Sequence, residues 1–322
     1  MSMLIARSSA TRQESQKTSQ QIENGRYATQ VLADDLRMAG YYGEFNPPSS
    51  LTPASIPDPS LTTVADLTSA LPLAVQGYHN GASLPAGLSS ILTDIRTSPP
   101  TDVLVVRRAS SCIAGAPGCA CMPGLAGCPA AAQQSHYYFQ TPLCANQLSN
   151  LTASQFIISS NPAVFSTNNG IAGSTPSYFA AKDCVTMASV RSYRTNIYYV
   201  SNNHKAGDGI PTLNVAELTT SGFTVTPLVE GIDSLQFEYG QDTDGNGSPD
   251  QFSSTLPDAP SWKSVTAVRI HVLARNTLST TDFTDSRYYN LGATSIGPFN
   301  DNFKRHVYNT FVRLTNVAQR FE

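Results

Sequence analysis

The sequence predicts an α+β protein in which a long N-terminal α-helix packs on a large, antiparallel, β-rich globular head with disulfide-stapled loops. Apolar residues with helical spacing occur near the N-terminus, whereas from residue 102 onward the chain is a series of short runs rich in β-branched and aromatic residues. These runs do not alternate with helical segments, so we expect no βαβ units. We therefore assign residues 1–43 to the helix and 44–322 to the head, with a cysteine-rich loop insertion at about 109–185.

The helix is predicted most strongly over residues 21–43. One face of this segment carries Ala28, Val31, Leu32, Leu36 and Ala39. Gly40 follows at the position where helices commonly end in a left-handed residue. Asp34 and Asp35 occupy the other side and diverge by about 100° around the helix, so they cannot share a substrate. We expect them to be solvated, or paired with groups on the head or on a neighbouring subunit.

The strands of the head are predicted from β-forming runs separated by turn residues. A strongly apolar run at 102–108 indicates a central strand, and shorter runs follow at 135–140 and 155–159. The second half of the chain is more regular, with strands expected at 185–200, 212–218, 222–226, 232–239, 266–275 and 305–314. A short helical turn is expected at 64–71.

Composition and motifs exclude several classes of protein. Only 13% of residues are charged and the net charge is −3, so we expect no nucleic-acid partner. There is no run of about 18 apolar residues that would span a membrane. The five histidines are scattered, and no phosphate-binding loop, dinucleotide fingerprint or serine-nucleophile motif occurs. We therefore expect a protein that is not an enzyme.

An even number of cysteines lies in the middle third of the chain. These residues are Cys112, Cys119, Cys121, Cys128, Cys144 and Cys184. The first four stand in a Gly-, Pro- and Ala-rich loop, where disulfides would restrict the unfolded chain and stabilise by roughly 2–4 kcal/mol each. Zinc is the less favoured alternative, because zinc sites prefer cysteine pairs separated by two to four residues and no histidine lies at ligand spacing. Disulfides indicate the periplasm or the cell surface, and 15 pairings are open.

An Asp-rich segment at 242–250 has the spacing of a calcium-binding loop. Its candidate ligands are Asp242, Asp244, Asn246, Ser248 and Asp250, with Gly247 at the sharp turn. The twelfth position is Ser253, not a bidentate glutamate, which implies weaker binding or a carboxylate borrowed from elsewhere, Asp258 for example. We expect a structural Ca²⁺ here; the alternative is a solvated hairpin turn.

Three segments resemble one known family. Residues 23–28 (ENGRYA) with 34–43 (DDLRMAGYYG), residues 228–240 followed by 262–272, and residues 305–316 resemble the minor pilin family PilW of type IV pili. The segment 228–240 and the strand after it also resemble the type II secretion pseudopilin GspJ. The family pattern implies a leader, a cleavage site and a hydrophobic half-helix before this point. We expect that trimming or a late start has removed them, and that residues 1–6 are the end of the apolar part.

The resemblance implies a structural role in assembly. A protein of this family would assemble with other minor pilins in the inner membrane, facing the periplasm, and would prime polymerisation of the major pilin. It would then remain at or near the pilus tip with a large adhesin, and so serve twitching motility and cell adhesion. The alternatives are an extracellular β-rich adhesin or ligand-binding module, or a type II secretion pseudopilin.

Overall fold

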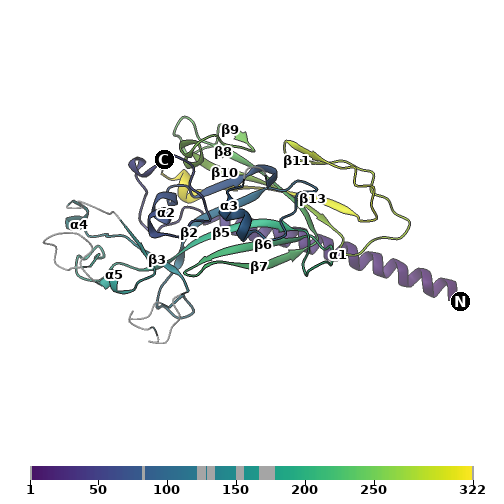
Figure 1. Cartoon of the computed structure of the whole chain (residues 1–322), viewed down its shortest axis with the longest axis horizontal. Helices are drawn as coiled ribbons and strands as arrows, with labels where there is room; N and C mark the ends of the chain where they lie inside the picture. The colour runs from purple at the N-terminus through teal and green to yellow at the C-terminus, as the bar shows by residue number, and fades with distance from the viewer. Residues whose placement is uncertain are drawn as a thin grey trace.

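A computed structural model describes residues 2–81, 84–121, 128, 135–149, 156–166 and 178–320. Its first element is the helix α1, Ser2–Arg37, whose side chains are described from residue 12 onward. The start of α1 projects from one end of an elongated head, and the short helices α4 and α5 lie at the other end (Figure 1). No helix within the described residues is long and apolar enough to cross a membrane.

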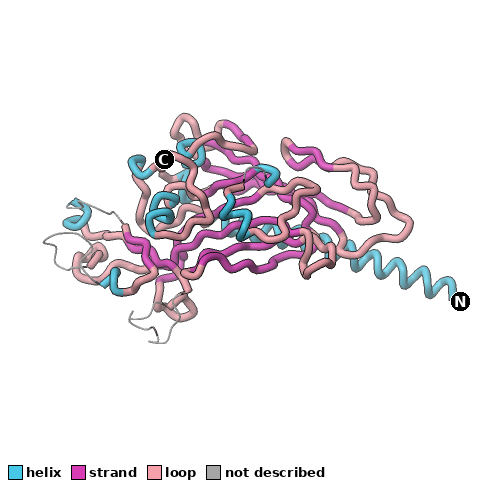
Figure 2. Tube along the Cα trace, in the orientation of Figure 1, coloured by secondary structure: helices cyan, strands magenta, loops and turns pink. Residues whose placement is uncertain are grey.

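Two main antiparallel sheets make up the head (Figure 2). The larger has the strand order β1-β2-β5-β3-β4, and β6 and β7 extend it beside β5. The smaller has the order β13-β10-β8-β9, and β11 and β12 form a separate hairpin. The strands are β1 Val75–Tyr78, β2 Val103–Ile113, β3 Tyr137–Gln140, β4 Ile157–Ser159, β5 Arg191–Ser201, β6 Thr212–Thr219, β7 Gly222–Glu230, β8 Ile232–Gln241, β9 Gln251–Ser253, β10 Val265–Arg275, β11 Tyr289–Leu291, β12 Thr294–Ile296 and β13 Arg305–Arg313.

Short helices connect these strands. They are α2 Val64–Ala70, α3 Ala86–Ile91, α4 Ala145–Ser149, α5 Ala163–Ser166, α6 Ala259–Lys263 and α7 Thr315–Ala318, with 3₁₀ turns η1 Ser49–Leu51 and η2 His79–Gly81. The predicted α+β class, with one long N-terminal helix, antiparallel sheets and three disulfides, is confirmed. The helical turn expected at 64–71 is α2.

Each strand predicted from the sequence overlaps an observed strand, although β2 and β7 continue beyond the predicted ends and one prediction began well before its strand. Residues 185–200 were expected to be extended throughout, whereas β5 starts at Arg191. The backbone before it is held in a tight turn, because Ala181 N–H donates to Thr186 O and Ala188 N–H donates to Phe179 O, each at 2.8 Å. The short strands β1, β9, β11 and β12 were not predicted from the sequence.

The main core lies where α1 meets both sheets. Ala28, Leu32 and Leu36 of α1 are fully buried in the same cluster as Leu104 of the larger sheet and Ile270 of the smaller one. Fully burying a leucine side chain stabilises a fold by about 1.5–3 kcal/mol. The apolar face predicted for the helix therefore consists of core residues.

Two glycines shape the path of α1. Gly25 faces Tyr308 of β13 so closely that a Cβ at this position would lie 2.1 Å from the tyrosine ring. Gly40, just beyond the helix, has a φ of +72°, which confirms the left-handed residue predicted there. Its N–H donates to Arg107 O at 2.9 Å, so the chain leaves α1 and joins β2.

Candidate functional site

The carboxylate of Asp35 joins α1 to the larger sheet. It is 6% exposed and accepts hydrogen bonds from Asn196 Nδ2 at 2.8 Å and Tyr198 OH at 2.8 Å, with Arg108 Nε at 2.5 Å. Burial and the adjacent carboxylate together raise the pKa of Tyr198, which therefore stays a hydrogen-bond donor. Of the alternatives considered for Asp35, solvation is wrong and pairing with the head is correct, because the sheet covers this side of the helix.

Asp34, next to it, remains on the surface. Its side chain is 57% exposed and pairs with Arg37 one turn further along α1 at 2.5 Å. Both partners are solvated, so this pair contributes little to stability. The two adjacent aspartates thus have different environments, which the diverging directions of neighbouring helical residues explain.

Nearer its start, α1 is held by the connection between β10 and β13. Glu14 accepts hydrogen bonds from Lys17 Nζ at 2.8 Å, Lys304 Nζ at 3.0 Å and Thr280 Oγ1 at 3.1 Å. The two ammonium groups lower the pKa of Glu14 from 4.5 to about 2. Lys17 Nζ also donates to Ser279 O at 2.8 Å, which adds a second contact between α1 and this connection.

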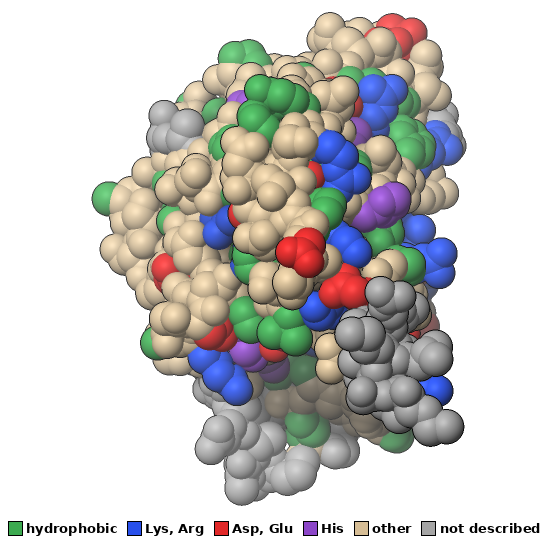
Figure 3. Space-filling model, turned by 90° about the vertical axis from the view of Figure 1, so that its right-hand side faces the viewer, with side chains coloured by type: hydrophobic (Ala, Val, Ile, Leu, Met, Phe, Trp, Pro, Cys, Tyr) green, Lys and Arg blue, Asp and Glu red, His purple; other side chains and the backbone are tan. Residues whose placement is uncertain are grey.

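The outer side of α1 faces solvent along the head. Glu23, Arg26, Tyr27 and Gln30 are exposed, and Tyr27 is 55% exposed despite its large ring. Hollows of about 530 Å³ and 460 Å³ lie beside the helix. Figure 3 looks at the end of the molecule from which α1 projects and shows basic side chains gathered on one side of this face. This surface combines charged, polar and apolar side chains.

The six cysteines form three disulfides, so disulfides and not zinc account for them in this structure. The pairs are Cys112–Cys119, Cys121–Cys128 and Cys144–Cys184. The first two each close a ring over a sequence separation of 7, whereas the third spans 40 residues. Part of the predicted insertion at 109–185 lies outside the described residues.

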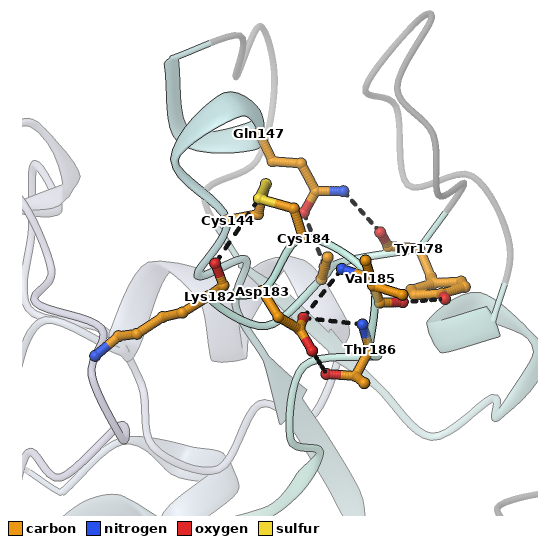
Figure 4. The surroundings of a disulfide bond; sticks show 9 residues. Cys144, Gln147, Tyr178, Lys182, Asp183, Cys184, Val185 and Thr186 are labelled. Atoms are coloured by element: carbon orange, nitrogen blue, oxygen red, sulfur yellow. Dashed lines mark hydrogen bonds between the residues drawn. A yellow bond between two sulfur atoms is a disulfide. The ribbon is translucent and has the colours of Figure 1, made fainter.

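The third disulfide holds a compact turn at the end of the head (Figure 4). Gln147 bridges it, because its Nε2 donates to Tyr178 O and its Oε1 accepts from Ala180 N–H, both at 2.8 Å. Asp183 accepts from the N–H groups of Val185 and Thr186, which lower the pKa of its carboxyl group. The segment that contains Cys184 is therefore fixed by hydrogen bonds as well as by the disulfide.

The Asp-rich loop brings three of its predicted ligands together. Carboxylate oxygens of Asp242, Asp244 and Asp250 lie within 4.8 Å of one another. Asn246 is part of the same turn, since its Oδ1 accepts from Ser248 N–H at 2.8 Å. This donor set of clustered carboxylate oxygens fits the hard cation Ca²⁺.

Each carboxylate of the loop also supports the backbone. Asp242 accepts from the N–H groups of Gly245 at 2.7 Å and Gly247 at 2.8 Å, and it is only 4% exposed. Thr243 donates to Asp250 through both its N–H and its hydroxyl at 2.7 Å, which lowers the pKa of Asp250. The tight turn predicted for this segment is present, whether or not a cation occupies it.

Two residues that could have completed a calcium site have other roles. Asp258 is the N-cap of α6, where its Oδ1 accepts from Ser261 N–H at 2.8 Å. Ser253 lies at the end of β9 and donates to Thr255 O at 2.7 Å. The acidic group found in the structure consists of Asp242, Asp244 and Asp250, and Asp258 is not among them.

A buried ionic network was missed by the sequence analysis. Asp233 is fully buried and lies 2.7 Å from Arg305 Nε and 2.9 Å from Arg96 Nη2. Arg305 also lies 3.1 Å from the buried Asp285. These charges come from separate segments of the head, and nothing in the sequence near any one of them indicates the others.

The comparisons with known proteins concern part of the chain. Residues 197–316 match the model of the family PilW, Type IV Pilus-assembly protein W. No curated protein matches the chain. A solved structure, a type IV-like pilin from Thermus thermophilus, aligns with a TM-score of 0.25 and 15% identity, over 42% of this chain and 70% of that one. The family match confirms the resemblance to PilW over residues 197–316, from the second half of β5 to just after β13, and the motifs at 23–43 lie outside the matched segment.

Proposed function

We propose, from the match of residues 197–316 to the PilW model, that this protein is a non-enzymatic minor pilin of a type IV pilus. In this proposal it assembles in the inner membrane with other minor pilins, primes polymerisation of the major pilin, and remains at or near the pilus tip with a large adhesin. The match is the observation that carries the proposal.

The arrangement of α1 and the head supports this role. The helix is 36 residues long, or about 54 Å at 1.5 Å per residue, and its first part projects from the head. Its second half is built into the core beside both sheets. Because the helix is fixed to the head with no flexible linker between them, the position of the helix in a filament would also determine the position of the head.

Deletion of the gene tests the proposal. We expect the deletion strain to show few or no surface pili by electron microscopy and to lose twitching motility, and we expect the unaltered gene to restore both. A tag fused directly after α7 is unsuitable for this experiment, because Val317 and Ala318 of that helix are buried.

The phenotype of the deletion strain also distinguishes the minor pilin role from the two alternatives. Normal piliation with impaired type II secretion would favour a pseudopilin. Normal piliation and normal secretion, with loss of surface attachment, would favour an extracellular binding module. Either result would contradict the minor pilin role.

We also propose that the Asp-rich loop binds one structural Ca²⁺. Asp244 and Asp250 are exposed, whereas Asp242 is buried and holds backbone N–H groups, so Asp242→Ala would disturb the loop even without a cation. The sharper variant is Asp244→Asn, which removes one negative charge and keeps the shape.

Chelation provides the measurement. We expect EDTA to lower the Tm of the unaltered protein and to leave the Tm of Asp244→Asn almost unchanged. Asp258→Asn, outside the acidic group, should retain the full effect of EDTA. A Tm that does not respond to EDTA in the unaltered protein would identify the loop as an ordinary turn.

A further inference from the structure

A surface groove lies beside the Cys144–Cys184 disulfide, since it is lined in part by Leu143, Lys182 and Leu148 of α4. Figure 1 shows α4 at the end of the head away from the start of α1. Two adjoining hollows, of about 370 Å³ and 280 Å³, share Glu44, Thr141 and Leu143 and form one continuous feature. We call it the 41–46 groove, because the segment 41–46 forms one of its walls. Its combined size is that of small-ligand pockets in other proteins.

The walls of the 41–46 groove are fixed in place. Phe139 and Tyr42 are buried at its base. The ring centroid of Phe45 lies 5.1 Å from that of Phe156, so this half-buried ring is held by packing. On the opposite wall, Leu143 N–H donates to Ala180 O at 2.9 Å beside the disulfide. A preformed groove loses little entropy when a ligand binds.

The groove combines aromatic rings with charged groups. Arg191 lies with its guanidinium carbon 5.7 Å from the centre of the Tyr41 ring. Lys182 and Glu44 form an exposed ion pair at 2.5 Å, and Figure 4 shows Lys182 pointing away from the disulfide. The lining thus has two cations against one carboxylate.

Arg191 has charge available for a ligand. Its Nη1 donates to the backbone carbonyls of Ser110 and Ser111, and no carboxylate within the described part of the chain forms an ion pair with it. A carboxylate is a group that a guanidinium binds well, through paired hydrogen bonds. The half-buried ring of Tyr41 lines the same hollow as Arg191, and the half-buried ring of Phe45 lines the adjoining one, so both supply flat apolar faces to the groove.

We propose that the 41–46 groove binds an acidic saccharide, whose carboxylate pairs with Arg191 and whose sugar rings rest on Tyr41 and Phe45. An extended peptide is the less suitable occupant, because peptides commonly dock by adding a strand to a free sheet edge. Here β3, which leads into the groove, is paired on both sides, with β4 and with β5. The proposal depends on these contacts and not on the proposed role in pili.

Titration calorimetry with the purified, disulfide-bonded protein tests the proposal. We expect trigalacturonic acid to bind at least tenfold more tightly than neutral galactotriose. Arg191→Ala and Tyr41→Ala should each weaken binding of the acidic sugar at least tenfold. Lys182→Ala should weaken it as well, and because this side chain is 71% exposed the variant carries little risk of unfolding.

Matched controls lie away from the groove, Arg269 on β10 of the smaller sheet and Tyr288 just before β11. Arg269→Ala and Tyr288→Ala remove an arginine that is 46% exposed and a tyrosine that is 66% exposed, and both variants should bind as the unaltered protein does. Absence of binding, equal binding of the neutral sugar, or insensitivity to all three groove variants would overturn the proposal. Equal binding of hexaglutamate at the same residues would overturn it too, in favour of an acidic peptide. Because the readout is binding in vitro, a failure here is distinct from a failure of the piliation test.

Discussion

Asp35 shows how one buried charge attaches the helix to the head. Its partners Arg108, Asn196 and Tyr198 come from β2 and β5, and they satisfy both carboxylate oxygens. A buried ion pair need not stabilise a fold relative to an apolar pair, but the loss of one partner leaves the other charge buried and uncompensated. The guanidinium of Arg108, whose side chain is 17% exposed, would be that charge.

We therefore expect Asp35→Ala to lower the free energy of unfolding by about 3 kcal/mol. Asp34→Ala is the matched control, since it removes a neighbouring but solvated carboxylate and should change stability by less than about 1 kcal/mol. Urea denaturation followed by circular dichroism measures both. Equal effects of the two substitutions would mean that Asp35 does not anchor the helix.

At the scale of elements, the contact between α1 and β13 depends on a residue without a side chain. Glycine inside a helix costs about 1 kcal/mol relative to alanine, so its presence at position 25 needs a reason. The ring of Tyr308 occupies the space that a Cβ of residue 25 would need, and His306 packs edge-on against that ring at 4.8 Å. Gly25 thus permits the close approach of helix and strand.

Gly25→Ala should consequently destabilise the protein, although the same change stabilises an ordinary exposed helix. We expect a loss of about 1–3 kcal/mol in the free energy of unfolding, from overpacking against Tyr308. In the background of Tyr308→Ala, the added methyl group should cost much less, so the two substitutions should be clearly non-additive. Additive effects in a double-mutant cycle would argue against this contact.

At the scale of the whole molecule, the disulfides and the matched family segment lie in different parts of the chain. The three disulfides fall between Cys112 and Cys184, whereas the segment similar to PilW spans 197–316. The smaller sheet, β13-β10-β8-β9, belongs entirely to the second part and packs on α1. The division of the chain at residue 43 into a helix and a head stays a prediction. Because α1 shares one core with both sheets, the structure does not separate the two as independent units.

Reduction of the disulfides should therefore act on part of the molecule. We expect reduced protein to lose amide protection in residues 135–149 and 178–188, while β8, β10 and β13 keep theirs. Hydrogen exchange followed by mass spectrometry, with and without dithiothreitol, measures this difference. Joint loss of protection in both regions would show that the disulfides stabilise the whole fold as one cooperative unit.

Features that depend on local pattern could be predicted from the amino-acid sequence. The helix followed from apolar spacing, the left-handed end at Gly40 from a glycine after the last apolar turn, and most strands from runs of β-forming residues. The proximity of Asp242, Asp244 and Asp250 followed from their alternation in a tight turn, and the presence of disulfides from an even count of cysteines. Each of these depends on residues close together in the chain.

Which distant residues meet was established only by the folded structure. Asp35 and Asn196 are 161 positions apart, so their hydrogen bond leaves no trace in either local sequence. The pairing of the cysteines, the buried network around Asp233 and Arg305, and the meeting of Tyr41 with Arg191 at one groove are of the same kind. They share one physical reason. Strand order and helix docking are determined by burial of the whole core, and a polar group that is buried with it is stabilised only by the hydrogen-bond partners that the fold places beside it.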